Sequence, residues 1–229
     1  MRRIGFVSLT QGAGSRFVAA NLACFLAQEV HLDPAVLELG RPGLSDALAL
    51  DRRFAGKPFD PAGGLPNKAA GVNWQVQAPA ELQKSGRGET EPLALEPPGW
   101  YEQLRLMDRV EGDVVLCLWS GSVPELQQEF LRQMDRTVLV IDPLPSRLLA
   151  GWNGSAVPCT DITVINKMNK GVKIRQLQSF LERRPCASVP LVPAEHLYRA
   201  EYNGCFPYEL EPVRQALKQS LQELWNAIR

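Results

Sequence analysis

Short apolar runs alternate with segments of helical periodicity along most of the 229-residue chain. The runs predict strands at residues 3–9, 35–39, 72–78, 113–119, 137–142, 161–166 and 189–192. Apolar residues at helical spacing predict helices at 15–29, 44–50, 99–108, 123–134, 144–150, 173–183, 196–203 and 209–228. Buried strands that alternate with helices are typical of one fold class. The pattern predicts an α/β fold with a doubly wound, mainly parallel sheet and helices on both faces.

The first predicted strand ends in a turn that contains two glycines. Backbone N–H groups in such a turn, together with the N-terminus of the following helix, favour an anion. A working phosphate loop also needs a lysine for the β- and γ-phosphates and a Ser or Thr hydroxyl for Mg²⁺. Neither stands at its expected position, so the sequence predicts a degenerate phosphate loop. Its residues are Thr10, Gln11, Gly12, Ala13, Gly14, Ser15 and Arg16.

The stretch VSLTQGAGSRFVAANLACFLA resembles the first motif of the MinD/ParA family of deviant-Walker ATPases, which reads KGGxGKT followed by a helix containing NLA. The resemblance places Thr10 at the signature lysine that reaches the partner subunit's nucleotide. Ser15 stands at the phosphate-loop lysine, and Arg16 stands at the Mg²⁺-binding Thr or Ser. Gly12 and Gly14 are retained, which favours the shape of the loop. A guanidinium at Arg16 could hold a carboxylate or a phosphate with two hydrogen bonds.

The acidic positions of the family motifs are also altered. The segment AVLELGRPGLSDALAL resembles the family's second strand, with Glu38 at the first acid and Gly40 at the acid that orients the attacking water. The segment DVVLCLWSGS resembles the strand that ends in the Mg²⁺-holding Asp. It places Leu118 there, or Trp119 if the register shifts by one. The resemblance therefore implies that the carboxylates expected at Gly40 and Leu118 are lost.

Two later segments resemble motifs on the base side of the nucleotide. In DITVINKMNKG, Asn166 stands at the base-contacting position, and VPLVPAEHLYRAEYNGCFPYE resembles the closing motif with Pro193 and Glu195 in step. These three residues are candidates for the adenine side. Because the motifs follow in order over nearly the whole chain, we predict one P-loop domain over 1–229. The chain resembles a degenerate MinD/ParA member, with the TadZ/CpaE group as one possible placement.

The lost groups have an energetic consequence for nucleotide binding. A hydrogen bond to a charged group contributes about 1.5–3 kcal/mol, so losing the lysines, hydroxyl and carboxylate removes on the order of 5 kcal/mol or more. At about 1.4 kcal/mol per tenfold change, binding weakens more than about a thousandfold. Phosphoryl transfer depends on the same groups for positioning and charge stabilisation. We therefore expect no ATPase activity, no metal and no bound cofactor, with ATP or ADP binding weakly at most.

Composition limits the classes of partner. Lys and Arg number 25, as do Asp and Glu, so no overall charge attracts nucleic acid. The five cysteines contain no C-x-x-C pair, which favours reduced thiols. The two histidines, His31 and His196, have no cysteine or histidine at ligand spacing, so no zinc site is predicted. The first apolar run is too short for a signal peptide, and we expect a cytoplasmic protein.

Two surface segments leave alternatives open. A stretch rich in Gly, Pro and charge at about 83–99 predicts a flexible loop, either a partner-contact lid over Ser85 to Gly99 or a solvated tip. The final helix, Glu209 to Arg229, carries an apolar stripe that favours packing on its own sheet. Membrane attachment through that helix is the less favoured alternative, because its polar face is not strongly basic.

Three functions are compatible with these residues. The first is a degenerate MinD/ParA-like protein that binds other proteins in spatial positioning or assembly, for example of pilus or division machinery, as a homodimer or with an active paralogue. The second is an ATP-binding switch with slow or no hydrolysis. The third is a dinucleotide-binding oxidoreductase, because GAGSRF with Glu38 at the end of the second strand is a partial dinucleotide fingerprint.

Overall fold

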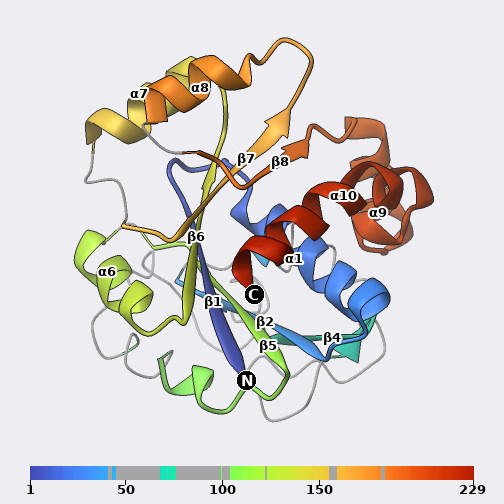
Figure 1. Ribbon diagram of the computed structural model, residues 1–229. Coiled ribbons are helices and arrows are strands. Elements are labelled where there is room, and N and C mark those ends of the chain that lie inside the picture. The colour runs from blue at the N-terminus through green and yellow to red at the C-terminus, as the bar shows by residue number, and fades with distance from the viewer. Residues whose placement is uncertain are drawn as a thin grey trace, which may run out of the picture.

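The computed structural model describes residues 1–40, 43–44, 68–75, 99, 104–121, 123–154, 159–181 and 184–229. Within them lies a single eight-stranded sheet with the order β3, β4, β2, β5, β1, β6, β7, β8 (Figure 1). Neighbouring strands are parallel throughout, except that β3 and β4 are antiparallel. The strands are β1 (Arg2–Ser8), β2 (Pro34–Leu39), β3 (Lys68–Ala69), β4 (Val72–Gln75), β5 (Val114–Trp119), β6 (Arg136–Ile141), β7 (Ile162–Met168) and β8 (Ala187–Pro190).

Helices cover both faces of the sheet, and each face has its own apolar core (Figure 1). One core contains the apolar residues of α1, η2 and α10, and the other contains those of α6, α7 and α8. Side chains alternate between the two cores along each strand, as Phe6 and Val7 do on β1. The helices are α1 (Ser15–Phe25), η1 (Leu26–Val30), α6 (Pro124–Arg132), α7 (Pro145–Gly154), α8 (Ile174–Leu181), α9 (Ala194–Asn203), η2 (Pro207–Glu209) and α10 (Glu211–Ile228).

The predicted doubly wound, mainly parallel sheet is confirmed, and differences occur at its edges and helix ends. The antiparallel edge strand β3 was not predicted, because two residues are too short to give a periodic signal. The first helix ends in a π-helical turn, η1, after which His31 adopts the left-handed conformation. Residues 45–50 of the predicted helix at 44–50, residues 100–103 of that at 99–108 and residues 83–98 of the predicted flexible loop at 83–99 lie outside the described residues, whereas residues 104–107 are helical as predicted.

The C-terminal helix α10 packs on the sheet, as its pattern predicts. Its apolar stripe is buried in the same core as α1, which is the favoured reading of the two given by the sequence. Over the described residues, no helix combines the length and apolar character needed to span a membrane. The stripe consists of Val213, Leu217, Leu221, Leu224, Trp225 and Ile228.

Candidate functional site: the phosphate loop

The loop between β1 and α1 has the backbone shape of an anion cradle. Gly12 and Gly14 adopt left-handed conformations with φ of 83° and 93°, and the N–H of Ala13 donates to the carbonyl of Thr10 at 3.1 Å. Among the described residues, the N–H groups of Gly12 and Gly14 have no acceptor. A Cβ on Gly14 would lie 2.2 Å from Nδ2 of Asn166, so the glycine is required by space as well as by conformation. The two glycines therefore keep the backbone geometry of a phosphate loop.

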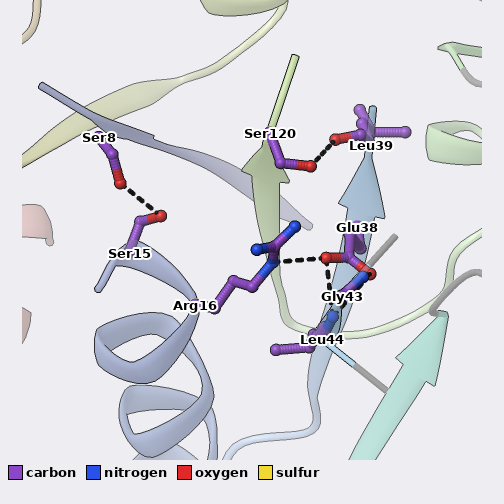
Figure 2. Close-up of polar contacts among 8 residues, drawn as sticks. All are labelled: Ser8, Ser15, Arg16, Glu38, Leu39, Gly43, Leu44 and Ser120. Atoms are coloured by element: carbon purple, nitrogen blue, oxygen red, sulfur yellow. Dashed lines mark hydrogen bonds and ion pairs between the residues drawn. The ribbon is translucent and has the colours of Figure 1, made fainter. Parts of the chain in front are cut away.

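Ser15, at the position of the phosphate-loop lysine, is bonded back to the strand. The hydroxyl of Ser8, the last residue of β1, donates to the hydroxyl oxygen of Ser15 at 2.8 Å (Figure 2). Ser15 is also buried at the start of α1. A short hydroxyl held in this way brings no positive charge to the loop, whereas a lysine would place an ammonium on the phosphates.

Arg16, at the position of the metal-binding hydroxyl, forms an ion pair with Glu38 at the end of β2. Its Nε lies 2.7 Å from Oε1 of Glu38, whose side chain is fully buried (Figure 2). The N–H of Leu44 donates to both carboxylate oxygens at 2.9 and 3.1 Å, and the N–H of Gly43 donates at 3.3 Å. Burial raises the pKa of Glu38 above its ordinary 4.5, although Arg16 and these N–H groups act in the opposite direction. The carboxylate is thus committed to groups of its own chain.

At the lost acid positions, the surroundings of Gly40 and Leu118 disfavour a carboxylate. Gly40 has a φ of 90°, and a Cβ there would lie 2.8 Å from the backbone nitrogen of Gly121. Leu118 is buried in the core and pairs in register with Glu38 on β2. In the alternative register, Trp119 is buried in the core of the other face. Residues at both positions serve packing and chain geometry.

These positions do not fit a Mg²⁺ ion bound in the manner of the family motif. A guanidinium replaces the metal-binding hydroxyl, and the nearby carboxylate already pairs with it. Magnesium requires oxygen ligands in near-octahedral geometry and commonly keeps several waters. In the part of the chain that the structure describes, no group of three or more His, Cys, Asp or Glu side chains could hold a metal ion.

The outer side of the loop is held by side chains from the other half of the sheet. Three consecutive loop carbonyls each accept one hydrogen bond, so side chains outside the loop hold it through its carbonyl groups. The donors are Arg147 Nη1 to Gln11 at 3.0 Å, Lys167 Nζ to Gly12 at 2.6 Å and Asn166 Nδ2 to Ala13 at 2.9 Å.

Lys167 connects the loop to a buried carboxylate. Its Nζ lies 2.8 Å from Oδ2 of Asp142, whose side chain is only 4% exposed, and Lys167 itself has a left-handed φ of 58°. Sequence reasoning missed Lys167, Asp142 and Arg147. A signal was available, because the carboxyl ends of neighbouring parallel strands meet at one edge, and Asp142 and Lys167 lie at the ends of β6 and β7.

The three adenine-side candidates occupy different places. Asn166 is buried against the phosphate loop, where its amide holds the carbonyl of Ala13. Pro193 precedes α9 as its N-cap residue. Glu195 is exposed in the first turn of α9, 3.9 Å from His196, and no hydrogen bond or ion pair joins it to the loop among the described residues. Contact of these residues with a base stays a prediction.

A small cavity separates the first turn of α1 from α9. Its volume is about 110 Å³, and Arg16, Phe17, Leu197 and Glu201 contribute to its lining. Ligand pockets usually measure roughly 300–1,000 Å³. The cavity is therefore too small to enclose a whole nucleotide.

Comparison with known proteins fixes the fold. No protein-family model matches the sequence, and no curated protein matches it significantly. Among solved structures, a ParA family ATPase from Chlorobium tepidum TLS matches with a TM-score of 0.68 and 16% identity, covering 97% of this chain and 98% of that chain. This chain has the fold of the MinD and ParA ATPases.

Two MinD structures give the same result. The septum site-determining protein MinD from Pyrococcus horikoshii OT3, complexed with Mg-ADP, matches with a TM-score of 0.65 and 17% identity, covering 97% of this chain and 95% of that chain. The MinC:MinD cell division complex of Aquifex aeolicus matches with a TM-score of 0.67 and 15% identity, covering 99% of this chain and 96% of that chain. The MinD/ParA-type P-loop fold predicted from the motifs is confirmed.

Proposed function

We propose that this chain is a degenerate MinD/ParA-like protein that lacks ATPase activity and acts by binding other proteins in spatial positioning or assembly. The ion pair between Arg16 and Glu38 carries the proposal, because it joins the position of the Mg²⁺-binding hydroxyl to the position of the first acid in the family's second-strand motif. Phosphoryl transfer depends on metal and cationic groups around the phosphates. With Ser15 in place of the phosphate-loop lysine, the loop lacks that charge as well.

A protein-binding role is supported by the fold and by the charge of the chain. One structure with this fold is a complex of MinD with MinC, so the fold forms an assembly with another protein in that relative. The neutral overall composition gives no matching support for nucleic-acid binding. A homodimer, or a heterodimer with an active paralogue, would rest on contacts between protein groups.

Phosphate release from ATP tests the proposed function. The purified chain is incubated with Mg·ATP beside an active MinD as a positive control, and again with each candidate protein partner. We expect release at the rate of the protein-free blank in every case. Turnover that rises with protein concentration, and that falls when Glu38 is replaced by Gln, would overturn the proposal.

A second candidate is an ATP-binding switch with slow or no hydrolysis. One observation favours it: the loop keeps its left-handed glycines, and the Lys167 ammonium lies directly beside it, 2.6 Å from the carbonyl of Gly12. An ammonium has three N–H donors, and here two of them are used. Nucleotide binding that needs no Mg²⁺ and is lost in Lys167→Met would favour this switch.

The dinucleotide-binding oxidoreductase is disfavoured by the surroundings of Glu38. A ribose-binding acid must accept hydrogen bonds from the ligand's hydroxyl groups. Here both carboxylate oxygens accept from Leu44, one also accepts from Arg16, and the side chain has no exposed surface. Titration with NADH, followed by fluorescence, should therefore give no saturable signal.

A further inference from the structure

An apolar groove of about 570 Å³ runs between α7 and α8, which lie side by side on the face opposite α1 and α10 (Figure 1). Its floor contains the buried side chains of Leu148 and Leu177. Its sides carry Leu144, Leu149 and Phe180, which are 53%, 49% and 37% exposed. Large apolar side chains that are gathered at the surface in this way are typical of an interaction site.

The segments that form the groove carry an excess of basic residues, although the whole chain is balanced at 25 basic and 25 acidic residues. Residues 142–154 and 167–181 contain five bases against one acid, Asp142, which is buried and already paired with Lys167. Arg147 and Lys167 donate to carbonyls of the phosphate loop, which leaves three unopposed bases in these segments, and of these Lys173 lines the groove. The five bases are Arg147, Lys167, Lys170, Lys173 and Arg175.

The concave shape selects among partners that carry negative charge. A flat lipid surface is best met by a convex apolar ridge that can enter the headgroup layer. Here Leu148 and Leu177 form a floor that lies below exposed side chains on both flanking helices. Only side chains that protrude from a partner can reach this floor. The apolar face of an amphipathic helix fills a groove of this kind with side chains at i, i+3, i+4 and i+7.

We propose that the groove between α7 and α8 binds an amphipathic helix of a partner protein, with its apolar stripe on the groove floor and acidic residues along its flanks. Leu144, Leu149 and Phe180 contact the stripe, and Lys170 and Lys173 attract the acidic flanks. This inference rests on the proposed function, because it names the surface through which a protein-binding member acts. It identifies the partner by chemistry: an acidic, apolar-striped helix.

Selection from a peptide library tests the proposal directly. The library displays helices of about 16 residues, roughly four turns, with leucine fixed along one stripe and the flanking positions varied among Glu, Lys, Gln and Ser. Peptides are selected on the wild-type chain and counter-selected on Leu149→Asp. The proposal predicts enrichment of Glu at the flanks. Enrichment of Lys, or no bias in charge, would overturn it.

A charge exchange then separates groove binding from other causes. For a synthetic selected peptide, Leu149→Asp and the double variant Lys170→Glu with Lys173→Glu should each weaken binding at least about tenfold. A peptide with its Glu residues replaced by Lys should regain affinity for the double variant. Unchanged binding by Leu149→Asp, or no recovery with the Lys peptide, would contradict the proposal.

Matched controls address folding and the other occupants. Tyr198→Asp changes an aromatic residue on α9 that is 69% exposed, against 49% for Leu149, and should leave peptide binding unchanged. Leu149 is half exposed, so its variant should melt like the wild type. Binding of the wild type, but not of Leu149→Asp, to phosphatidylserine vesicles in place of the peptides would assign the groove to a membrane. Self-association lost in the same variant would assign it to a second copy; either result would overturn the proposal.

The two proposals fail separately. Peptide binding needs no nucleotide, so its absence leaves the prediction of no ATP turnover standing. Turnover of ATP by the wild-type chain would remove the proposed function, while the peptide measurement would still report on the groove.

Discussion

Glu38 lies fully buried at the end of β2, where it accepts hydrogen bonds from Arg16 and from the backbone of Leu44. A buried ion pair adds little net stability, but removing one partner leaves an uncompensated charge. Replacing Arg16 by Thr, as in the family motif, would therefore destabilise the fold before any metal could bind. Because of this pair, the phosphate loop of the family motif could be restored only by changing several positions together.

The buried carboxylate predicts a pH dependence. Because the pKa of Glu38 is raised above 4.5 in the folded state, the folded chain holds that proton more tightly than the unfolded chain. The contribution of Glu38 to the free energy of unfolding is therefore greatest below this value and falls as pH rises through the raised pKa. Urea denaturation over the pH range from below 4.5 to above the raised pKa should show that this part of the unfolding free energy falls in the wild type. No such fall should occur in Glu38→Gln. Parallel pH profiles of the two proteins would contradict the burial of this charge.

The backbone conformation at Gly40 predicts a loss of stability when the water-orienting acid is restored there. Its φ of 90° and the 2.8 Å approach of a Cβ to the Gly121 nitrogen mean that Gly40→Asp and Gly40→Ala should both lose about 1–3 kcal/mol of unfolding free energy. Gly171→Ala is the control, since the nearest atom to its Cβ is a side-chain oxygen of Asn169 at 3.2 Å. Wild-type stability of Gly40→Asp in urea denaturation would show that the backbone here readily moves.

Between elements, β7 and α7 hold the phosphate loop by its carbonyl groups. Lys167 both donates to the loop and neutralises Asp142, so Lys167→Met should lower the unfolding free energy by about 1–3 kcal/mol. It should also speed hydrogen exchange in the loop, since the carbonyl of Gly12 loses its donor. Lys170→Met, an exposed neighbour, serves as the control. Equal exchange rates in the loops of both variants would refute this role of Lys167.

The elements also show what the sequence could and could not reveal. Glycines at 12 and 14 predicted the left-handed turn, and the apolar stripe predicted the buried face of α10, because both signals are local. The contacts of Lys167 and Arg147 with the loop join residues more than 100 positions apart, and only strand order brings them together. For Arg16, the sequence predicted only that its guanidinium could hold a carboxylate or a phosphate, and the pairing with Glu38 was not predicted.

On the scale of the whole molecule, the two faces of the sheet have different surroundings. The face with α1 and α10 is closed by the buried stripe of the C-terminal helix. The face with α7 and α8 keeps an open apolar groove whose lining includes Lys173, within a chain of zero formal charge. Arg147 belongs to α7 and also donates to the phosphate loop, so the groove and the loop lie near one another.

Calorimetric titration of the wild-type chain with Mg·ATP, repeated with ATP and a metal chelator, tests the central claim most directly. If the Arg16–Glu38 pair has replaced the metal site, the titrations should show no saturable binding tighter than about 10 μM, and Mg²⁺ should not improve it. Tighter binding that depends on Mg²⁺ would contradict the claim, because the loop would then hold a metal-bound nucleotide despite that pair.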